Sequence, residues 1–258
     1  MGAHPAVTPG VERAELADGR TVVVKSGDPA AEAAGLRWLA VPGGPPVPEV
    51  LDTGPDRLVT TYIPPGRPDR AAAVDLGRRL AVLHAAGAPA FGSPPPGGPR
   101  VATIGLAPMT NDPAPEWALW YATDRVLPYL RTARDAGAVS AADAASVERA
   151  CGRLPRLDAP PARLHGDLWA GNVLWSTDGA WLIDPAAHGG HRETDLAMLA
   201  LFGCPHLDAV LGAYDEVTPL ADGWRERVPL HQLFPLLVHA ALFGGGYGAQ
   251  AAAAAATV

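Results

Sequence analysis

Asn172 and Asp184 lie at the open end of an expected β-hairpin. Residues 163–175 read RLHGDLWAGNVLW, and a turn at 176–179 separates VLW from the AWLID run. Residues equidistant from a hairpin turn face each other, so Asn172 falls opposite Ile183 and beside Asp184; a two-residue loop would shift the register by two but keep both at the same end. With Cβ atoms about 5 Å apart, an amide oxygen and a carboxylate can share one hard cation such as Mg²⁺. The alternative is that both residues cap turns.

Asp167 adds a possible base to this pair. It follows Gly166 and lies five residues before Asn172. The pattern H-G-D-x-x-x-x-N has the spacing of the protein-kinase catalytic loop, in which the aspartate accepts the substrate hydroxyl proton and the asparagine holds metal. A carboxylate is a weak base, so Asp167 would act by orienting a hydroxyl while cations stabilise the transferring phosphoryl group. The apolar residue before His165 and the turn after it favour a bracing role for that histidine.

The chain contains 19 arginines but a single lysine, Lys25, at the end of the TVVVK run. This bias suggests a site that needs a compact ammonium, although chance survival of one lysine is the alternative. Glu32 follows on the apolar stripe of an expected helix, with Leu36 and Leu39, where an unpaired charge is costly. Lys25 is its expected partner, as in the strand-lysine to helix-glutamate pair of kinases. The alternative for Glu32 is stabilisation by the helix dipole.

Four stretches before residue 64 carry strand or helix signals. They are a hairpin over 11–25 with its turn at Asp18-Gly19, a helix from an Asp28-Pro29 cap to about Leu39, and strands at 47–51 and 58–63. The PPGRP run breaks both periodicities. We therefore expect a first domain at 1–63, a linker at 64–68 and a second domain at 69–258.

The second domain is expected to be mostly helical. The helical stretches are 71–85, 116–136 with an interruption near Pro128, 141–154, and the chain from about Thr194 with breaks at Pro229 and Pro235. The low-complexity tail GAQAAAAAATV is expected to fray. A small sheet with one helix, followed by a larger helical part, is an α+β, two-lobed plan.

Bulk properties exclude several classes of partner. A net charge of −7 without a basic block argues against nucleic acid or an anionic membrane as the main partner. We expect no secretory signal, and the best membrane candidate, residues 233–242, is short enough to be a buried helix instead. Cys151 and Cys204 are too few for a disulfide framework and have no metal-type spacing. We expect a cytoplasmic protein.

Several stretches distributed along the chain point to one family. They are HGDLWAGN, LIDPAAHGGHRETDLAMLALFG, DGRTVVVK, EAAGLRWL, LGRRLAVLH, TIGLAPMTND with EWALWY, and LLVHAALFGGGYG. Together they resemble the fructosamine kinase, or ketosamine 3-kinase, family within the aminoglycoside-phosphotransferase and choline-kinase-like group. The resemblance covers roughly residues 11–248, and D-P-A followed by G-H-R-E-T-D-L-A is specific to this branch. It implies a protein-kinase-like fold with a small, shortened β-rich N-lobe and a larger helical C-lobe.

The resemblance implies a kinase that uses ATP and Mg²⁺ to phosphorylate a sugar hydroxyl of a small-molecule ketosamine or glycated amine. Asp167 would be the catalytic base, and Asn172 and Asp184 would be the Mg²⁺ ligands. Lys25 would contact the nucleotide phosphates, with Glu32 as its partner.

Further positions follow from the same resemblance. The hinge, whose backbone would meet adenine, comprises Thr60, Thr61, Tyr62 and Ile63. Trp169 would line the sugar pocket, and Asn111 and Trp117 lie in the segment that would shield it. For Glu193 and Asp195, in the family signature, we favour a structural role as caps of the next helix.

One departure concerns the phosphate-covering loop. Kinases of this type begin with a strand and a glycine-containing loop. Here only ten residues precede the first expected strand, and Pro9-Gly10 is the one turn-type pair among them. That loop is expected to be shortened or missing, which puts ATP affinity in doubt. The alternatives are a related kinase for an aminoglycoside, choline or thiosugar, a nucleotide-binding pseudokinase, or a globular domain whose motif is structural. The motif has no acidic cluster beyond the metal site, which favours a sugar over a polycationic aminoglycoside.

Overall fold

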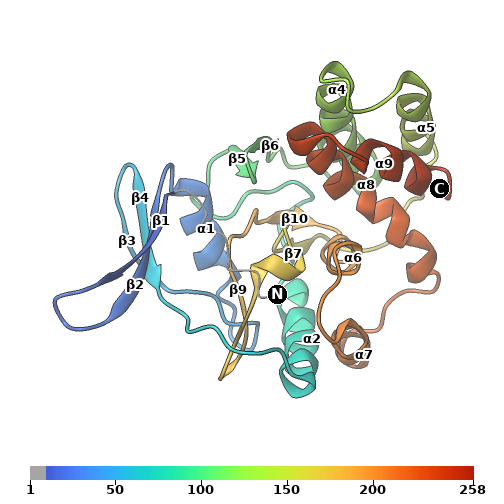
Figure 1. Ribbon diagram of the computed structural model, residues 1–258. Helices are drawn as coiled ribbons and strands as arrows, with labels where there is room; N and C mark the ends of the chain where they lie inside the picture. Colours follow the sequence, from blue (N-terminus) through green and yellow to red (C-terminus); the bar gives the residue numbers. More distant parts are fainter. Residues whose placement is uncertain (1–9) are drawn as a thin grey trace, which may run out of the picture.

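The computed structural model describes residues 10–258 and begins with a small antiparallel sheet (Figure 1). Its strands are β1 Val11–Glu15, β2 Thr21–Ser26, β3 Val50–Thr53 and β4 Arg57–Thr61, in the order β1-β2-β4-β3. The expected hairpin is confirmed, with Val11 opposite Lys25. The other two strands are displaced by one to three residues from their expected ranges. Pro48 lies inside the range expected for β3 and has no N–H for a strand ladder, and β3 begins after it at Val50.

Helix α1, Ala30–Leu39, joins the sheet to the rest of the molecule. It begins after the expected cap, and the Asp28 carboxylate accepts a hydrogen bond from the first helical N–H at 3.0 Å. Leu36 packs against Leu58 of the sheet. Leu39 instead belongs to the core of the helical part, so α1 is fixed on both sides.

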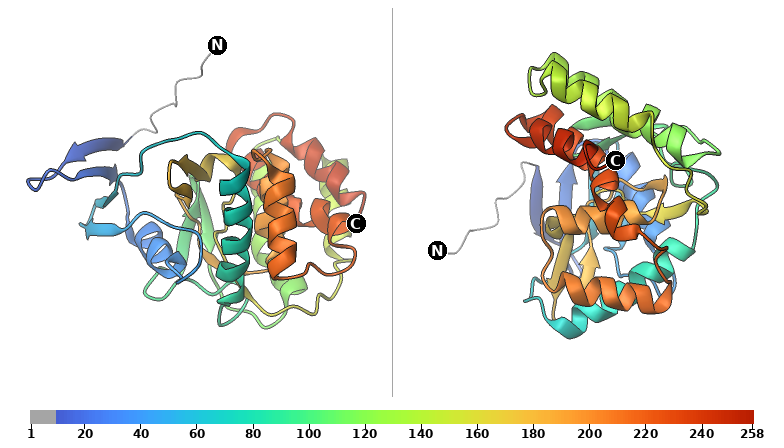
Figure 2. Two further views of the ribbon diagram at one scale, coloured as in Figure 1. Left: turned by 90° about the horizontal axis from the view of Figure 1, so that it is seen from below. Right: turned by 90° about the vertical axis from the view of Figure 1, so that its right-hand side faces the viewer.

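The second part is mostly helical, and Figure 2 shows the sheet projecting from one side of it. Its helices are α2 Arg70–Ala85, α3 Trp117–Trp120, α4 Leu127–Asp135, α5 Ala141–Cys151, α6 Glu193–Leu201, α7 Leu207–Val217, α8 Trp224–Phe243 and α9 Tyr247–Ala255. Its paired strands are β5 Val101–Ile104 with β6 Ala107–Thr110, β7 Ala162–Leu164 with β10 His188–Gly190, and β8 Val173–Ser176 with β9 Gly179–Leu182. This arrangement is the expected α+β plan.

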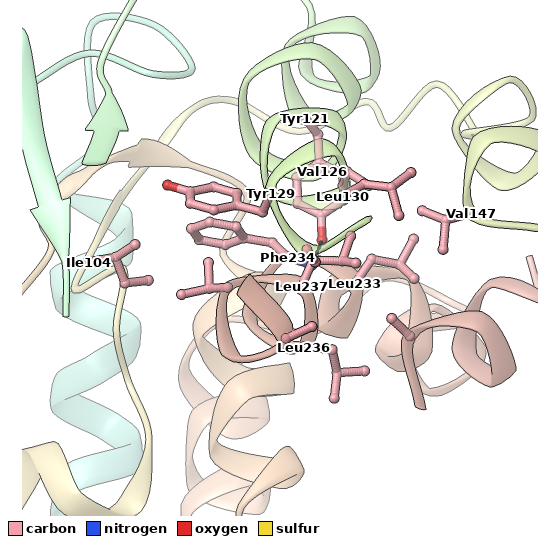
Figure 3. Close-up of a cluster of buried hydrophobic side chains, with 14 of the residues drawn as sticks. Ile104, Tyr121, Val126, Tyr129, Leu130, Val147, Leu233, Phe234, Leu236 and Leu237 are labelled. Atoms are coloured by element: carbon pink, nitrogen blue, oxygen red, sulfur yellow. Dashed lines mark hydrogen bonds between the residues drawn. The ribbon is translucent and has the colours of Figure 1, made fainter. Parts of the chain in front are cut away.

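The stretch expected as an interrupted helix at 116–136 is continuous but changes geometry. A π-helix at Tyr121–Val126 lies between α3 and α4. Pro128 lies in the first turn of α4, directly after the π-helix, and the helical stretch continues through it. Figure 3 shows Leu130 and the π-helix packed against Phe234 and its neighbours on α8.

Helix α8 runs through Pro229 and Pro235, where we expected breaks. Because Pro235 has no N–H, the His231 carbonyl lacks its helical donor, and the Tyr121 hydroxyl lies 3.1 Å from that oxygen. The same hydroxyl accepts a hydrogen bond from the Phe234 N–H at 3.2 Å. A side chain distant in sequence therefore stabilises the helix at its proline.

The C-terminal tail is ordered, and the expectation that it frays is wrong. It forms α9, whose small side chains, including Ala251 and Ala255, are buried against α5 and α8. Between residues 10 and 258, no helix combines the length and apolarity needed to cross a membrane.

Candidate active site

The β8–β9 hairpin places Asn172 beside Asp184. Trp175 pairs with Ala180, which is the register expected for the longer turn. The Ile183 N–H donates to the Asn172 carbonyl at 3.1 Å, so the predicted neighbours are confirmed. Asp184 adopts a φ of 54°, an uncommon conformation for a residue other than glycine and one found at strained functional positions.

His165 and Gly166 fix the loop that carries Asp167. His165 is fully buried, its Nε2 donates to the Ile183 carbonyl at 2.9 Å, and its Nδ1 accepts from the Asp167 N–H at 3.3 Å. Gly166 has a φ of 82°, and a Cβ there would lie 2.1 Å from the Ala186 carbonyl oxygen. Only glycine fits this position. The bracing role expected for His165 is confirmed.

Asp195 lies buried beneath the same loop. Its carboxylate accepts hydrogen bonds from the backbone N–H groups of His165 at 2.8 Å and Gly166 at 3.0 Å, and lies 3.2 Å from His84 Nε2. Burial opposes the charge on Asp195, but the hydrogen bonds from His84 and Gly166 outweigh it and lower its pKa. Asp195 therefore has a structural role, as expected, but it stabilises the catalytic loop rather than the N-terminus of α6.

Glu193 likewise does not cap α6. Arg227 binds both of its oxygens, at 2.5 and 2.8 Å, and His231 Nε2 lies 3.3 Å away. Ligand atoms of His191, Glu193 and His231 lie within 4.8 Å of one another, a spacing that could suit a metal ion. Because the Arg227 guanidinium already neutralises the carboxylate, we assign this cluster a structural role.

Lys25 bridges the sheet, α1 and the hairpin. Its ammonium lies 2.5 Å from the Glu32 carboxylate and also pairs with Asp184. Burial opposes the charge on Lys25, but the Glu32 and Asp184 charges outweigh it and raise its pKa, so the ammonium is retained. The predicted Lys25–Glu32 pair is confirmed.

Asp167 has the electrostatics of a base that can hold a proton near neutral pH. Burial raises its pKa to about 6, the hydrogen bond from Asn172 opposes this effect, and the Asp184 charge adds to it. An ordinary aspartate releases its proton near pH 4 and is a much weaker acceptor.

Asn172 and Asp184 fit a hard divalent cation. The Asn172 amide N–H₂ donates to the Asp167 carbonyl at 2.7 Å and to its carboxylate at 3.0 Å, which leaves the Asn172 amide oxygen as an available ligand. One carboxylate oxygen of Asp184 pairs with Lys25, and the other has no hydrogen-bond donor within residues 10–258. Two oxygen ligands leave positions for phosphate oxygens, as Mg²⁺ sites in phosphoryl-transfer enzymes do.

The structure brings most of the predicted site residues together. One cleft of about 480 Å³ is lined by six of them: Lys25, Glu32, Asp167, Trp169, Asn172 and Asp184. An adjoining cavity, which shares Lys25, Glu32 and Asp184 with the cleft, is lined by the four expected hinge residues, Thr60 to Ile63.

Asn111 and Trp117 do not line this cleft. Asn111 is buried beside it, and its amide oxygen accepts from the fully buried Arg125 at 2.9 Å. Trp117 is in the core, where its ring stacks on Tyr121 with a centroid distance of 4.9 Å. Trp117 is the first residue of α3, and the helix turns its side chain inward rather than toward the cleft.

The cleft also contains residues that the sequence reasoning missed. Part of the cleft wall comes from the end of β5 and the end of α8, where no site residue was expected. The residues are Ile104 of β5 and His239, Leu242 and Phe243 of α8. Only tertiary folding brings this helix end to the catalytic loop. In the sequence, the sole indication of a role for these α8 residues is that they lie in the family-like stretch LLVHAALFGGGYG.

Three comparisons with known proteins give matches that agree with one another. The family model described as fructosamine kinase matches residues 29–258. The probable ketoamine kinase YniA of Escherichia coli is 36% identical over 220 residues, which are 83% of this chain and 75% of that protein. The crystal structure of a candidate fructosamine-3-kinase from Thermobifida fusca is 48% identical, covers 96% of this chain and 88% of its own, and superposes with a TM-score of 0.90. A choline kinase from Streptococcus pneumoniae, 16% identical with a TM-score of 0.61 over 98% of this chain and 90% of its own, shares the fold.

Proposed function

The chain belongs to the fructosamine kinase family, and from this premise we propose that it transfers the γ-phosphoryl group of ATP, with Mg²⁺, to a hydroxyl of a small-molecule ketosamine. It is a phosphotransferase of the ketosamine kinase type that acts on a sugar hydroxyl. The observation that carries the detailed proposal is the placement of Asp167, Asn172, Asp184 and the Lys25–Glu32 pair in one cleft.

Asp167 would act on the acceptor hydroxyl. Its carboxylate accepts a hydrogen bond from the hydroxyl and orients the oxygen toward the γ-phosphorus. As the new P–O bond forms and the bond to the β-phosphate oxygen breaks, the hydroxyl proton passes to Asp167 and ADP keeps the electron pair. The raised pKa of Asp167, about 6, suits a group that must receive this proton.

Lys25, Asn172 and Asp184 would bind the phosphates. A bound Mg²⁺ would neutralise charge that develops on the phosphate oxygens. The Lys25 ammonium, held in place by Glu32, would contact the same phosphates directly. In the adjoining cavity, the Ile63 N–H has no hydrogen-bond acceptor within residues 10–258, so it is available to the adenine edge.

ADP release with fructose- and ribulose-derived ketosamines tests this proposal. We expect turnover by the wild-type chain and none above background by Asp167→Ala. No wild-type turnover, or undiminished turnover by Asp167→Ala, would contradict it. A thermal-shift titration with Mg-ATP separates the pseudokinase alternative, which predicts nucleotide binding without phosphoryl transfer.

A further inference from the structure

Aromatic side chains form a continuous wall that starts at the catalytic loop. We name this wall the aromatic rim: Trp169, Phe202, His239, Phe243 and Tyr247. The Trp169 ring meets Phe202 edge-on at 6.2 Å, and Phe202 packs on His239 at 4.7 Å. His239 in turn contacts Phe243 at 5.6 Å and Tyr247 at 5.1 Å. Trp169, His239 and Phe243 line the cleft, and the other two rings support them.

The rim is exposed at the edge of the cleft. Phe243 is 67% exposed and Trp169 is 40% exposed. Phe243 is the last residue of α8, and Gly244 and Gly245 follow with φ values of 64° and 62°, which end the helix there. Exposed apolar surface that is continuous with an active-site cleft is typical of ligand-binding surfaces.

The rim carries no charge. His239 Nδ1 donates to the Pro235 carbonyl at 2.8 Å, and burial lowers the His239 pKa, which favours the neutral ring. Among the carboxylates of the cleft, Glu32 and Asp184 pair with Lys25, Asp167 accepts a hydrogen bond from Asn172, and Asp28 accepts one from the Ala30 N–H; none of the four belongs to the rim. An ammonium group at the rim would therefore meet aromatic faces but no carboxylate of the rim itself. Exposed aromatic faces attract a cation only weakly, and this attraction replaces only part of the hydration that the ammonium group loses there. An alkyl end gains apolar contact with the same rings without that loss.

The chemistry of a ketosamine defines what reaches the rim. Its amine is attached to C1, beside the C2 carbonyl, and its hydroxyls begin at C3. When a hydroxyl lies at Asp167, the amine is only a few bonds away and its substituent must extend along the cleft wall. Trp169 lines the same cleft as Asp167 and continues into the rim, so the rim offers that substituent an apolar path to solvent.

We propose that the aromatic rim is the subsite for the amine substituent of the acceptor, and that it selects apolar substituents over substituents that end in a cation. This inference rests on the proposed ketosamine kinase function. It identifies Phe243, at the exposed end of the rim, as a specificity-determining residue.

Three fructose adducts test the inference: those of hexylamine, 1,5-diaminopentane and methylamine. The first two substituents have equal numbers of heavy atoms and differ only in a terminal methyl or ammonium group. We expect a kcat/KM about tenfold higher for the hexylamine adduct than for the diaminopentane adduct. Phe243→Ala should reduce this preference to below about threefold and should lose more activity on the hexylamine adduct than on the methylamine adduct. Leu119→Ala is the matched control, since Leu119 is 66% exposed but does not line the cleft, and it should keep the wild-type preference.

The outcomes separate the subsite from the proposed function. Turnover of all three adducts with equal rates, a preference for the cationic substituent, or an unchanged preference in Phe243→Ala would overturn the subsite and leave the kinase function intact. Absence of any turnover would contradict the kinase function. In that case calorimetric titration of the same adducts, with a non-hydrolysable ATP analogue present, tests the rim separately. The hexylamine adduct should bind about tenfold more tightly than the diaminopentane adduct, and equal affinities would overturn the subsite.

Discussion

Replacing Asp195 by asparagine removes the negative charge beneath the catalytic loop while keeping the side-chain shape. The carboxylate accepts from two loop N–H groups, at 2.8 and 3.0 Å, and is fully buried. Asparagine retains one acceptor oxygen, but its N–H₂ group would face a backbone donor. A hydrogen bond to a charged group contributes about 1.5–3 kcal/mol, and a buried donor without an acceptor costs about 1–3 kcal/mol. We therefore expect Asp195→Asn to lower the free energy of unfolding by about 3 kcal/mol.

Two measurements check this expectation. Thermal unfolding should show a Tm about 6–12 °C below that of the wild type, since about 3 kcal/mol corresponds to such a shift in a chain of this size. The kcat for the best ketosamine should fall at least about tenfold, because a small displacement of the loop misplaces Asp167. The matched control is Asp208→Asn, whose side chain is 71% exposed and, among residues 10–258, pairs only with Arg70; it should change stability by less than about 0.5 kcal/mol. If Asp195→Asn unfolds within about 0.5 kcal/mol of the wild type and keeps its kcat, the loop is held by other contacts and the reasoning is refuted.

Three further predictions concern the loop, the lysine and acid stability. Gly166→Ala should lower the free energy of unfolding by at least about 2 kcal/mol in urea titrations, because the alanine would have to adopt a left-handed φ and its Cβ would overlap the Ala186 carbonyl oxygen. An unchanged urea midpoint would contradict the packing described. Lys25→Arg should lower kcat/KM for ATP about a hundredfold in initial-rate assays, since a guanidinium does not fit between the Glu32 and Asp184 carboxylates; near wild-type rates would refute a specific need for ammonium. Burial, aided by a nearby arginine charge, lowers the pKa of His188 in the folded chain to about 3. In the unfolded chain the pKa of this histidine is near 6.5, so below that pH the unfolded chain binds a proton that the folded chain does not. His188 should therefore cost about 2 kcal/mol of stability between pH 7.5 and 5, and urea titrations of His188→Asn should show a smaller loss over that interval; an equal loss would contradict this assignment.

Local features of the site could be predicted from the sequence. The hairpin register follows from counting outward from a turn, and it places Asn172 beside Asp184. The Lys25–Glu32 pair follows from a charge on an apolar helix stripe that needs a neighbouring counter-charge. Both inferences involve short sequence separations, where geometry leaves few alternatives.

Features that depend on distant contacts could not be predicted in this way. Pro235 reads as a helix break unless the Tyr121 hydroxyl beside it is known. Asp195 reads as a cap, because its hydrogen bonds to the loop arise only after folding. The aromatic rim combines Trp169 with the end of α8, and no periodicity connects them.

The most direct test of the central claim is single-turnover phosphoryl transfer by Asp167→Asn at saturating Mg-ATP, with ATP affinity measured in parallel. Asparagine keeps the size of the side chain but cannot accept the hydroxyl proton. We expect the transfer rate to fall by about 10²–10⁴-fold while the Kd for Mg-ATP stays within about threefold of the wild-type value. A transfer rate within about twofold of wild type would contradict the assignment of Asp167 as the base.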